Sequence, residues 1–270
     1  MAATVDERTT ELSEQAREAV RDLILVMADS KRLLGMRYGE WMLGAADLEA
    51  GIACAAMTQD EWGHARQFYA MLKEFDEDPD RIEHGRGPEE YRNIEVLDRS
   101  PRSWPELVVV NALADTALAV QCDAMIGSTH GPLALRVEKI LEEEQFHFAH
   151  GVAWFRRLAR AGEEARAALT TAVEDALPVI LRWFGPDSER AERLKAEGVV
   201  DAAGDALRDR FLDRVGGLID ELGTEVRELA ARAPDFDGFD ESTRRATRDG
   251  PDAETVARIR GDKNAAFRLD

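Results

Sequence analysis

Apolar residues recur along this chain at spacings of three, four and seven, which is the period of an α-helix with one buried face. The pattern predicts a first helix from about Thr10 to Tyr38 and, after a break between Gly39 and Gly44, a second from about Ala46 to Phe75. The charged stretch from Arg81 to Pro105 is interrupted by glycines and prolines. It therefore predicts a long crossover with one short helical turn.

A second pair of helices follows the crossover. The third helix, from about Trp104 to Gly127, is the most apolar in the chain, and a turn from Gly127 to Pro132 ends it. Proline suits the first turn of a helix, so Pro132 predicts the start of a fourth helix, which runs to about Ala161. Two hairpins joined by a long crossover predict an all-α four-helix bundle.

Additional helices are predicted after the bundle. They run to about Phe184, from about Ser188 to Glu197 and from about Asp201 to Leu222, and they could buttress the bundle or form a subunit interface. Residues 231–270 are highly charged, which is typical of a solvated surface. We therefore expect one helical domain over residues 1–230 and a C-terminal tail with short helical pieces over 231–270.

The composition excludes several classes of partner. The net charge of −19 argues against nucleic acid and anionic membranes, which both attract an excess of Lys and Arg. No segment approaches eighteen uninterrupted apolar residues, and the N-terminus has no secretory pattern. Cys54 and Cys122 lack any paired spacing, so they predict reduced core residues. We expect a cytoplasmic protein that binds neither nucleic acid nor membranes.

Two short motifs carry the candidate chemistry. Glu61 and His64 form a Glu-x-x-His motif on the second helix, and Glu144 and His147 form another on the fourth. A spacing of three places both side chains of a motif on one helix face, where together they can bind a cation.

Two more acids fall on apolar helix faces. Asp29 lies on the first helix and Asp115 on the third, and a buried carboxylate is costly unless it is paired, neutralised or bound to a metal. Considered alone, Asp29 could instead pair with Arg32 or Arg37. Asp115 could likewise bond to a neighbour such as Asn111.

Positions relative to the turns bring these residues together. The midpoint between Asp29 and Glu61 is Ala45, and the midpoint between Asp115 and Glu144 falls in the second turn. Each acid is therefore predicted to lie level with its Glu. Two Asp, two Glu and two His inside a bundle are the ligand set of a carboxylate-bridged di-iron or di-manganese site. A plain bundle without metal remains the alternative, and the sequence does not identify the acceptor that each ligating imidazole needs.

A family resemblance rests on further motifs. The run Arg37-Tyr38-Gly39-Glu40-Trp41, followed by Leu48-Glu49 and Gly63-His64-Ala65-Arg66, resembles the ferritin-like subunits of the phenylacetate-catabolic ring-oxygenase family, the phenylacetyl-CoA epoxidase. The likeness covers roughly residues 20–185 and extends weakly to about 230. The turn motif is similar to that of the structural subunit in this family, whereas the retained Glu-x-x-His motifs match the catalytic subunit.

The resemblance implies a ferritin-like fold and a function. It implies two irons, with manganese possible, that activate O2 and oxygenate the ring of phenylacetyl-CoA or a similar aromatic CoA thioester. Glu61 and Glu144 would bridge the metals, a separate reductase would supply electrons, and the partner would be a homologous ferritin-like subunit or a second copy. A ferritin-like oxidase or iron-handling protein and a non-catalytic structural subunit remain open alternatives.

Overall fold

The structure, a computed structural model that describes residues 12–267, is built from helices and contains no strand within those residues, so the all-α prediction is confirmed. The first hairpin consists of α1 (Glu14–Glu40) and α2 (Leu48–Met71). The second consists of α4 (Trp104–Val109), a wide π-helical turn η5 (Val110–Asp115), α5 (Thr116–Asp123) and α6 (Gly131–Arg160). The predicted start of the first helix at Thr10 lies outside the described residues.

Capping explains where the bundle helices begin. The side chain of Ser13 accepts a hydrogen bond from the backbone N–H of Ala16, and that of Asp47 accepts one from Ala50. Such bonds satisfy N–H groups that the first turn of a helix leaves free. Pro132 sits in the first turn of α6, as predicted from the sequence.

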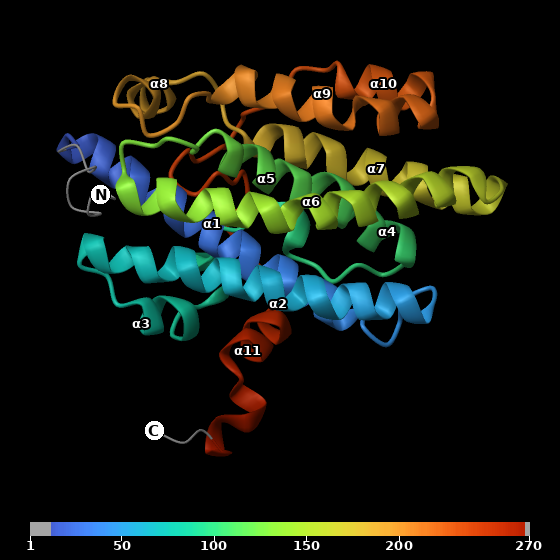
Figure 1. Ribbon diagram of the computed structural model, residues 1–270, viewed down its shortest axis with the longest axis horizontal. Coiled ribbons are helices and arrows are strands. Elements are labelled where there is room, and N and C mark those ends of the chain that lie inside the picture. The colour runs from blue at the N-terminus through green and yellow to red at the C-terminus, as the bar shows by residue number, and fades with distance from the viewer. Residues whose placement is uncertain (1–11, 268–270) are drawn as a thin grey trace, which may run out of the picture.

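The most apolar helix lies inside the bundle. Among the described residues, one helical stretch, Trp104–Asp123, is long and apolar enough to cross a membrane. Of its most apolar 18 residues, 89% are buried within the protein. This burial is what a core helix requires. Figure 1 shows α6 lying between α2 and α9 across the middle of the molecule.

The crossover contains more regular structure than the sequence predicted. It carries α3 (Pro79–His84) and two 3-10 turns, Pro88–Glu90 and Glu95–Leu97. Beyond the bundle, the remaining helices are α7 (Glu163–Trp183), α8 (Glu189–Ala196), α9 (Gly204–Leu222), α10 (Thr224–Ala230) and α11 (Ala253–Arg260).

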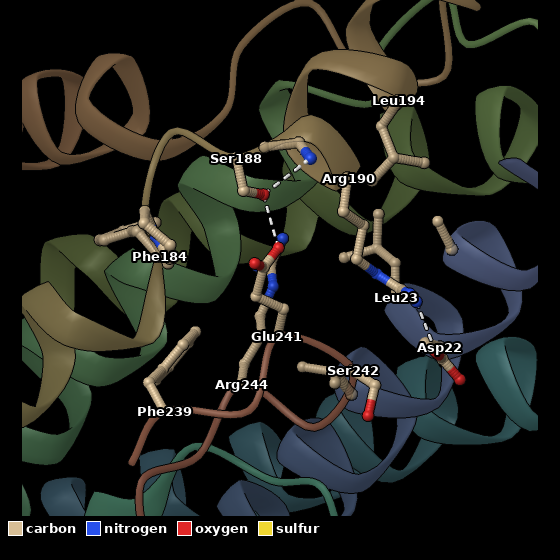
Figure 2. A pocket seen from close by; sticks show the side chains of 15 residues that line it. Asp22, Leu23, Phe184, Ser188, Arg190, Leu194, Phe239, Glu241, Ser242 and Arg244 are labelled. Atoms are coloured by element: carbon tan, nitrogen blue, oxygen red, sulfur yellow. Dashed lines mark hydrogen bonds and ion pairs between the residues drawn. The ribbon is translucent and has the colours of Figure 1, made fainter. Parts of the chain in front are cut away.

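The C-terminal segment contacts the bundle and its crossover. The guanidinium of Arg245 lies 2.6 Å from a carboxylate oxygen of Asp98 in the crossover. Figure 2 shows the same segment near α8, where Ser188 donates a hydrogen bond to Glu241. These contacts attach the charged C-terminal residues to the rest of the fold. The boundary at residue 230 stays a prediction.

A glycine allows α6 to approach the π-helical turn closely. A Cβ added at Gly151 would lie 2.8 Å from Oδ1 of Asn111 and 3.0 Å from Cα of Ala112. These distances are too short for a side chain, so glycine at this position permits the contact. The close approach sets Asp115, at the end of the turn, opposite the acids of α6.

Candidate metal centre

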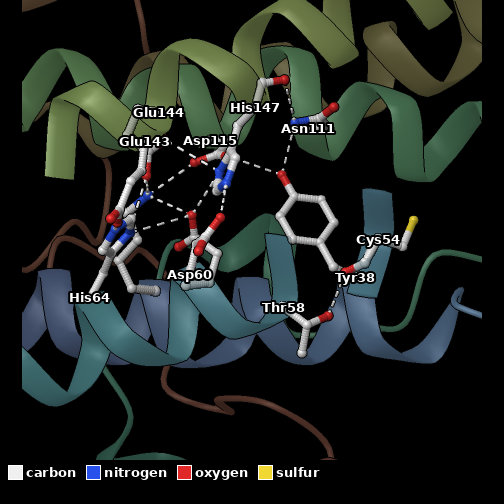
Figure 3. A network of polar contacts seen from close by, with 12 residues as sticks. Tyr38, Cys54, Thr58, Asp60, His64, Asn111, Asp115, Glu143, Glu144 and His147 are labelled. Carbon is white, nitrogen blue, oxygen red and sulfur yellow. Dashed lines mark hydrogen bonds and ion pairs between the residues drawn. The ribbon is translucent and has the colours of Figure 1, made fainter. Parts of the chain in front are cut away.

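Five of the six predicted ligands meet in the core of the bundle. Glu61 and His64 come from α2, Asp115 from the π-helical turn, and Glu144 and His147 from α6, and all five are at least 98% buried (Figure 3). One ligand atom from each of Glu61, Asp115, Glu144 and His147 lies within 4.8 Å of the others. This cluster of oxygen and nitrogen ligands could hold a metal ion.

A buried lysine occupies the middle of this cluster. Nζ of Lys31, from α1, lies 3.1 Å from Oε1 of Glu61, 3.0 Å from Oδ1 of Asp115 and 2.5 Å from Oε1 of Glu144. The side chain is fully buried. Sequence reasoning missed this residue, although a lysine seven residues before Tyr38 on the apolar face of the first helix was a visible signal.

Asp29 does not join the cluster, so the predicted convergence of all six side chains is wrong at this residue. Its carboxylate accepts a hydrogen bond from the Tyr69 hydroxyl at 2.6 Å and another from Nη1 of Arg86 at 2.9 Å. The backbone N–H of Arg92 donates a third at 2.8 Å. Asp29 is therefore a paired buried acid, but its partner comes from the crossover instead of from Arg32 or Arg37.

The register of the first hairpin explains the error. A Cβ added at Gly35 would lie 3.0 Å from Cβ of Glu61, and one added at Gly39 would lie 3.5 Å from the side chain of Thr58. The first turns of α2 thus extend past the end of α1, and the turn is not symmetric about Ala45. Level with Glu61, α1 presents a glycine, with Lys31 one turn earlier and no carboxylate.

Each of the two histidines contacts an acid on the helix that carries the other histidine. Nε2 of His64 lies 2.6 Å from Glu143, and Nε2 of His147 lies 3.3 Å from Asp60. Asp60 and Glu143 each directly precede the Glu of a motif, so each motif orients the histidine of the other. Sequence reasoning missed both acids, for which their position next to the motif was the available signal.

The inner nitrogens of both rings point at the carboxylates. Nδ1 of His147 lies 3.2 Å from Asp115 and 3.2 Å from Glu61, and Nδ1 of His64 lies 3.3 Å from Glu144. Oε2 of Glu61 is buried and has no hydrogen-bond partner among the described residues.

Tyr38 and Asn111 complete one side of the centre. The Tyr38 hydroxyl donates to Asp115 at 2.8 Å, and Nδ2 of Asn111 donates to the Tyr38 oxygen at 2.9 Å and to the backbone carbonyl of His147 at 3.1 Å. Asp115 therefore does not bond to Asn111 directly, as one alternative predicted; Tyr38 lies between them and bonds to both.

The close packing of charges shifts the pKa values of the groups involved. Burial opposes the charge on Lys31, but Asp115, Glu144 and Glu61 outweigh it and hold the lysine pKa well above its usual value. Burial likewise opposes protonation of the histidines, yet the neighbouring carboxylates raise the pKa of His64 to about 10 and that of His147 to about 12. Both imidazoles therefore hold protons in this arrangement.

The charges and contacts at this centre decide whether its residues fit two irons. The Lys31 ammonium and the two imidazolium ions offset the charge of the acids at the centre without any metal, and burial together with Asp115 raises the pKa of Glu144 to about 8, which further lowers the negative charge there. An imidazole must be neutral to bind a metal, and the ammonium lies within hydrogen-bonding distance of three oxygens that would be metal ligands. With Lys31 in this position, the residues do not fit a pair of irons.

Comparison with known proteins identifies relatives of this chain. A family model described as phenylacetic acid catabolic protein matches residues 1–243. The chain is 26% identical over 191 residues to one component of the 1,2-phenylacetyl-CoA epoxidase of Escherichia coli (strain K12), covering 70% of this chain and 62% of that component. It is 22% identical over 177 residues to a second component of the same enzyme, covering 65% of this chain and 71% of that component.

Proposed function

Because this chain belongs to the phenylacetic acid catabolic protein family, we propose that it is a subunit of a multicomponent oxygenase and that its own centre is structural. The complex would oxygenate the ring of phenylacetyl-CoA or a similar aromatic CoA thioester. Support for this substrate class comes from the two relatives, which are subunits of a phenylacetyl-CoA epoxidase. Within the complex, a homologous subunit would carry the catalytic metals and a separate reductase would supply electrons.

The position of Lys31 carries the proposal of a structural centre. Its ammonium contacts Glu61, Asp115 and Glu144 and is fully buried. A cation fixed to the chain offsets part of the charge of these acids at all times, so the bundle depends less on a metal for its charge balance. The absence of a carboxylate on α1 near Glu61 supports the same conclusion.

A second candidate is the catalytic subunit itself. The convergence of both Glu-x-x-His motifs with Asp115 favours it, because five side chains of a di-iron ligand set remain in place. In that case Glu61 and His64 would hold one iron, Asp115, Glu144 and His147 the other, and Glu61 and Glu144 would bridge them. Two irons, or two manganese ions, would supply O2 activation when bound, and Lys31 would have to leave the cluster.

Metal analysis combined with an oxygen-uptake assay separates the candidates. The chain is purified from iron-supplemented cells and assayed with a reductase and phenylacetyl-CoA, with and without a catalytic homologue from the same organism. A structural subunit binds less than one iron per chain and raises product formation only when the homologue is present. Two irons per chain and product formation by the chain alone would establish the catalytic subunit, with Glu61→Ala and Glu144→Ala each abolishing iron loading.

Iron loading with oxygen uptake that phenylacetyl-CoA does not stimulate would indicate the iron-handling alternative. Failure of the chain to alter the activity of any such homologue would contradict membership of the oxygenase complex.

A further inference from the structure

The solvent-exposed side of α2 and α6 is nearly uncharged over the middle of the bundle. No residue between Gln145 and Phe155 on α6 is Asp, Glu, Lys or Arg, and Glu49 is the only one between Leu48 and Gln59 on α2. In a chain that is 33% charged with a net charge of −19, such stretches are unusual for a water-facing surface.

Large apolar side chains stand on this surface. Phe146 is 77% exposed, Leu48 75% and Ile52 61%. By contrast, the exposed positions of α9, the next helix across the molecule (Figure 1), include Asp209, Asp213 and Asp220. Of the exposed large apolar side chains among the described residues, most lie on α2 and α6, and the others are Met42, Leu43, Ile126 and Phe267.

Each of the two helices presents a stripe with spacings of three and four. On α2 the stripe is Glu49, Ile52, Ala56, Gln59, Gly63 and Arg66. On α6 it is Glu142, Phe146, Ala149, Ala153 and Arg157. Both stripes point away from the core, because Glu61 and Glu144 lie on the opposite, buried sides of their helices. This spacing is that of helices that pack against a partner helix at about 20°.

The stripe on α6 is complementary to itself when it is reversed. About the point between Ala149 and His150, Glu142 is the mirror position of Arg157, and the large Phe146 is the mirror position of the small Ala153. A second copy of α6 running antiparallel would therefore place acid against base and phenylalanine against alanine. Contacts of this kind, in which residue i meets j and j meets i, define a two-fold symmetric interface.

The stripe on α2 has the same property about the same axis. The contacts of His147 with Asp60 and of Glu143 with His64 fix the antiparallel register of α2 and α6. In this register, the midpoint on α6 lies level with the point between Met57 and Thr58 on α2.

About that point on α2, Glu49 mirrors Arg66 and Ile52 mirrors Gly63. A Cβ added at Gly63 would have no atom within 4 Å, so the surface there is open to a side chain from outside. Neither Glu49 nor Arg66 has an ion-pair or hydrogen-bond partner among the described residues. Both charges are free to pair with another molecule.

From these matches we infer that the exposed faces of α2 and α6 form a two-fold interface with a second copy of this chain. The core of the interface is Phe146 and Ile52 packed on Ala153 and Gly63 of the other copy. The uncharged core keeps charge repulsion between two strongly acidic chains low where they touch. Dimer formation through this surface is independent of whether the buried centre is structural or catalytic.

A charge-swap experiment tests the register. Glu49 and Arg66 are separated by about 25 Å along α2, so they cannot interact within one chain. Glu49→Arg and Arg66→Glu should each weaken the dimer at least about tenfold, because like charges then face each other across the interface. The double variant should recover most of the wild-type dissociation constant.

Sedimentation equilibrium of the full chain gives the required masses. The wild type should have twice the 30.0 kDa mass of the chain, and Phe146→Glu should shift it to the monomer. Phe267→Glu, a matched change at an exposed phenylalanine outside α2 and α6, should leave the dimer intact. Circular dichroism checks that each variant folds, and Ile52→Glu replaces Phe146→Glu if that variant does not.

Three results would overturn the interface. The first is a monomeric wild type at the highest soluble concentration. The second is a dimer that survives Phe146→Glu or Ile52→Glu as well as it survives Phe267→Glu. The third is additive weakening by the two charge changes, without recovery in the double variant.

Discussion

Replacing Lys31 with methionine tests whether its ammonium stands in for a metal ion. Methionine has a similar length but no charge, so the change removes the cation while keeping most of the packing. In the wild type, Nζ lies 3.1 Å, 3.0 Å and 2.5 Å from oxygens of Glu61, Asp115 and Glu144. Without it, the buried acids Glu61, Asp115 and Glu144 face each other, and the only cations left at the centre are the two imidazolium ions, which also contact Asp60 and Glu143.

The size of the effect follows from this burial. Removing one partner of a buried ion pair costs about 3–5 kcal/mol. For a chain of this size, 1 kcal/mol shifts Tm by about 2–4 °C, so we expect Lys31→Met to lower Tm by roughly 10 °C.

A divalent metal should reverse much of that loss. An ion that binds only the folded state stabilises it by about 2.7 kcal/mol at a concentration 100 times Kd. We expect the Tm of Lys31→Met to rise with added Mn2+ or Fe2+ and the metal content to reach about one ion per chain, as the four-residue cluster suggests. The wild-type Tm should barely change.

Differential scanning calorimetry and metal analysis measure both effects. Lys139→Met serves as the control, since Lys139 is 69% exposed and its pair with Glu143 is long, at 4.0 Å. The reasoning fails if Lys31→Met is as stable as the wild type without metal. It also fails if the wild type binds metal as tightly as the variant does.

Three more substitutions test features of the core and the turn. Asp29→Asn should lower stability by about 3–5 kcal/mol, because Arg86 would stay buried without its carboxylate. Combined with Lys31→Met, it should leave the metal content of that variant unchanged. A loss of metal in the double variant would show that Asp29 is a ligand. Gly151→Ala should cost about 1–3 kcal/mol in denaturant unfolding, since its Cβ would meet Asn111 at 2.8 Å, and a neutral result would show that α6 can shift. Burial, helped by nearby arginines, holds the pKa of His130 at about 4. The unfolded chain therefore takes up a proton first as pH falls through about 6.5, and stability should drop between pH 6.5 and 4 by up to about 3 kcal/mol. His130→Asn should flatten that profile, and an unchanged profile would assign the loss to other groups.

The fold could be predicted from the sequence because its signals are local. Apolar periodicity located the helices of both hairpins, and the glycines and prolines around the crossover marked where the chain stops being helical. The π-helical turn could not be found in this way. Its residues Val110–Asp115 are all buried, so no polar position shows that the helix period changes there.

The centre was predictable to the extent that its residues share a helix face. Glu61 with His64 and Glu144 with His147 follow from a spacing of three, which holds on any α-helix. Asp29 failed because its placement depended on the shape of a turn, and an asymmetric turn moved α1 by several residues relative to α2. Arg86 reaches Asp29 from the crossover, a long-range contact that no spacing reveals.

The π-helical turn that ends at Asp115 changes the direction in which the following side chains point, within one continuous helical run. A π-helical turn holds about one residue more than an α-helical turn, and each residue turns an α-helix by about 100°. The residues of α4 can therefore face α7 while Asp115, further along the same run, faces Lys31. One additional residue lets a single stretch of chain meet two surfaces whose directions a regular helix could not satisfy together. If that residue were deleted, the helix could keep either the contacts of α4 with α7 or the contact of Asp115 with Lys31, but not both.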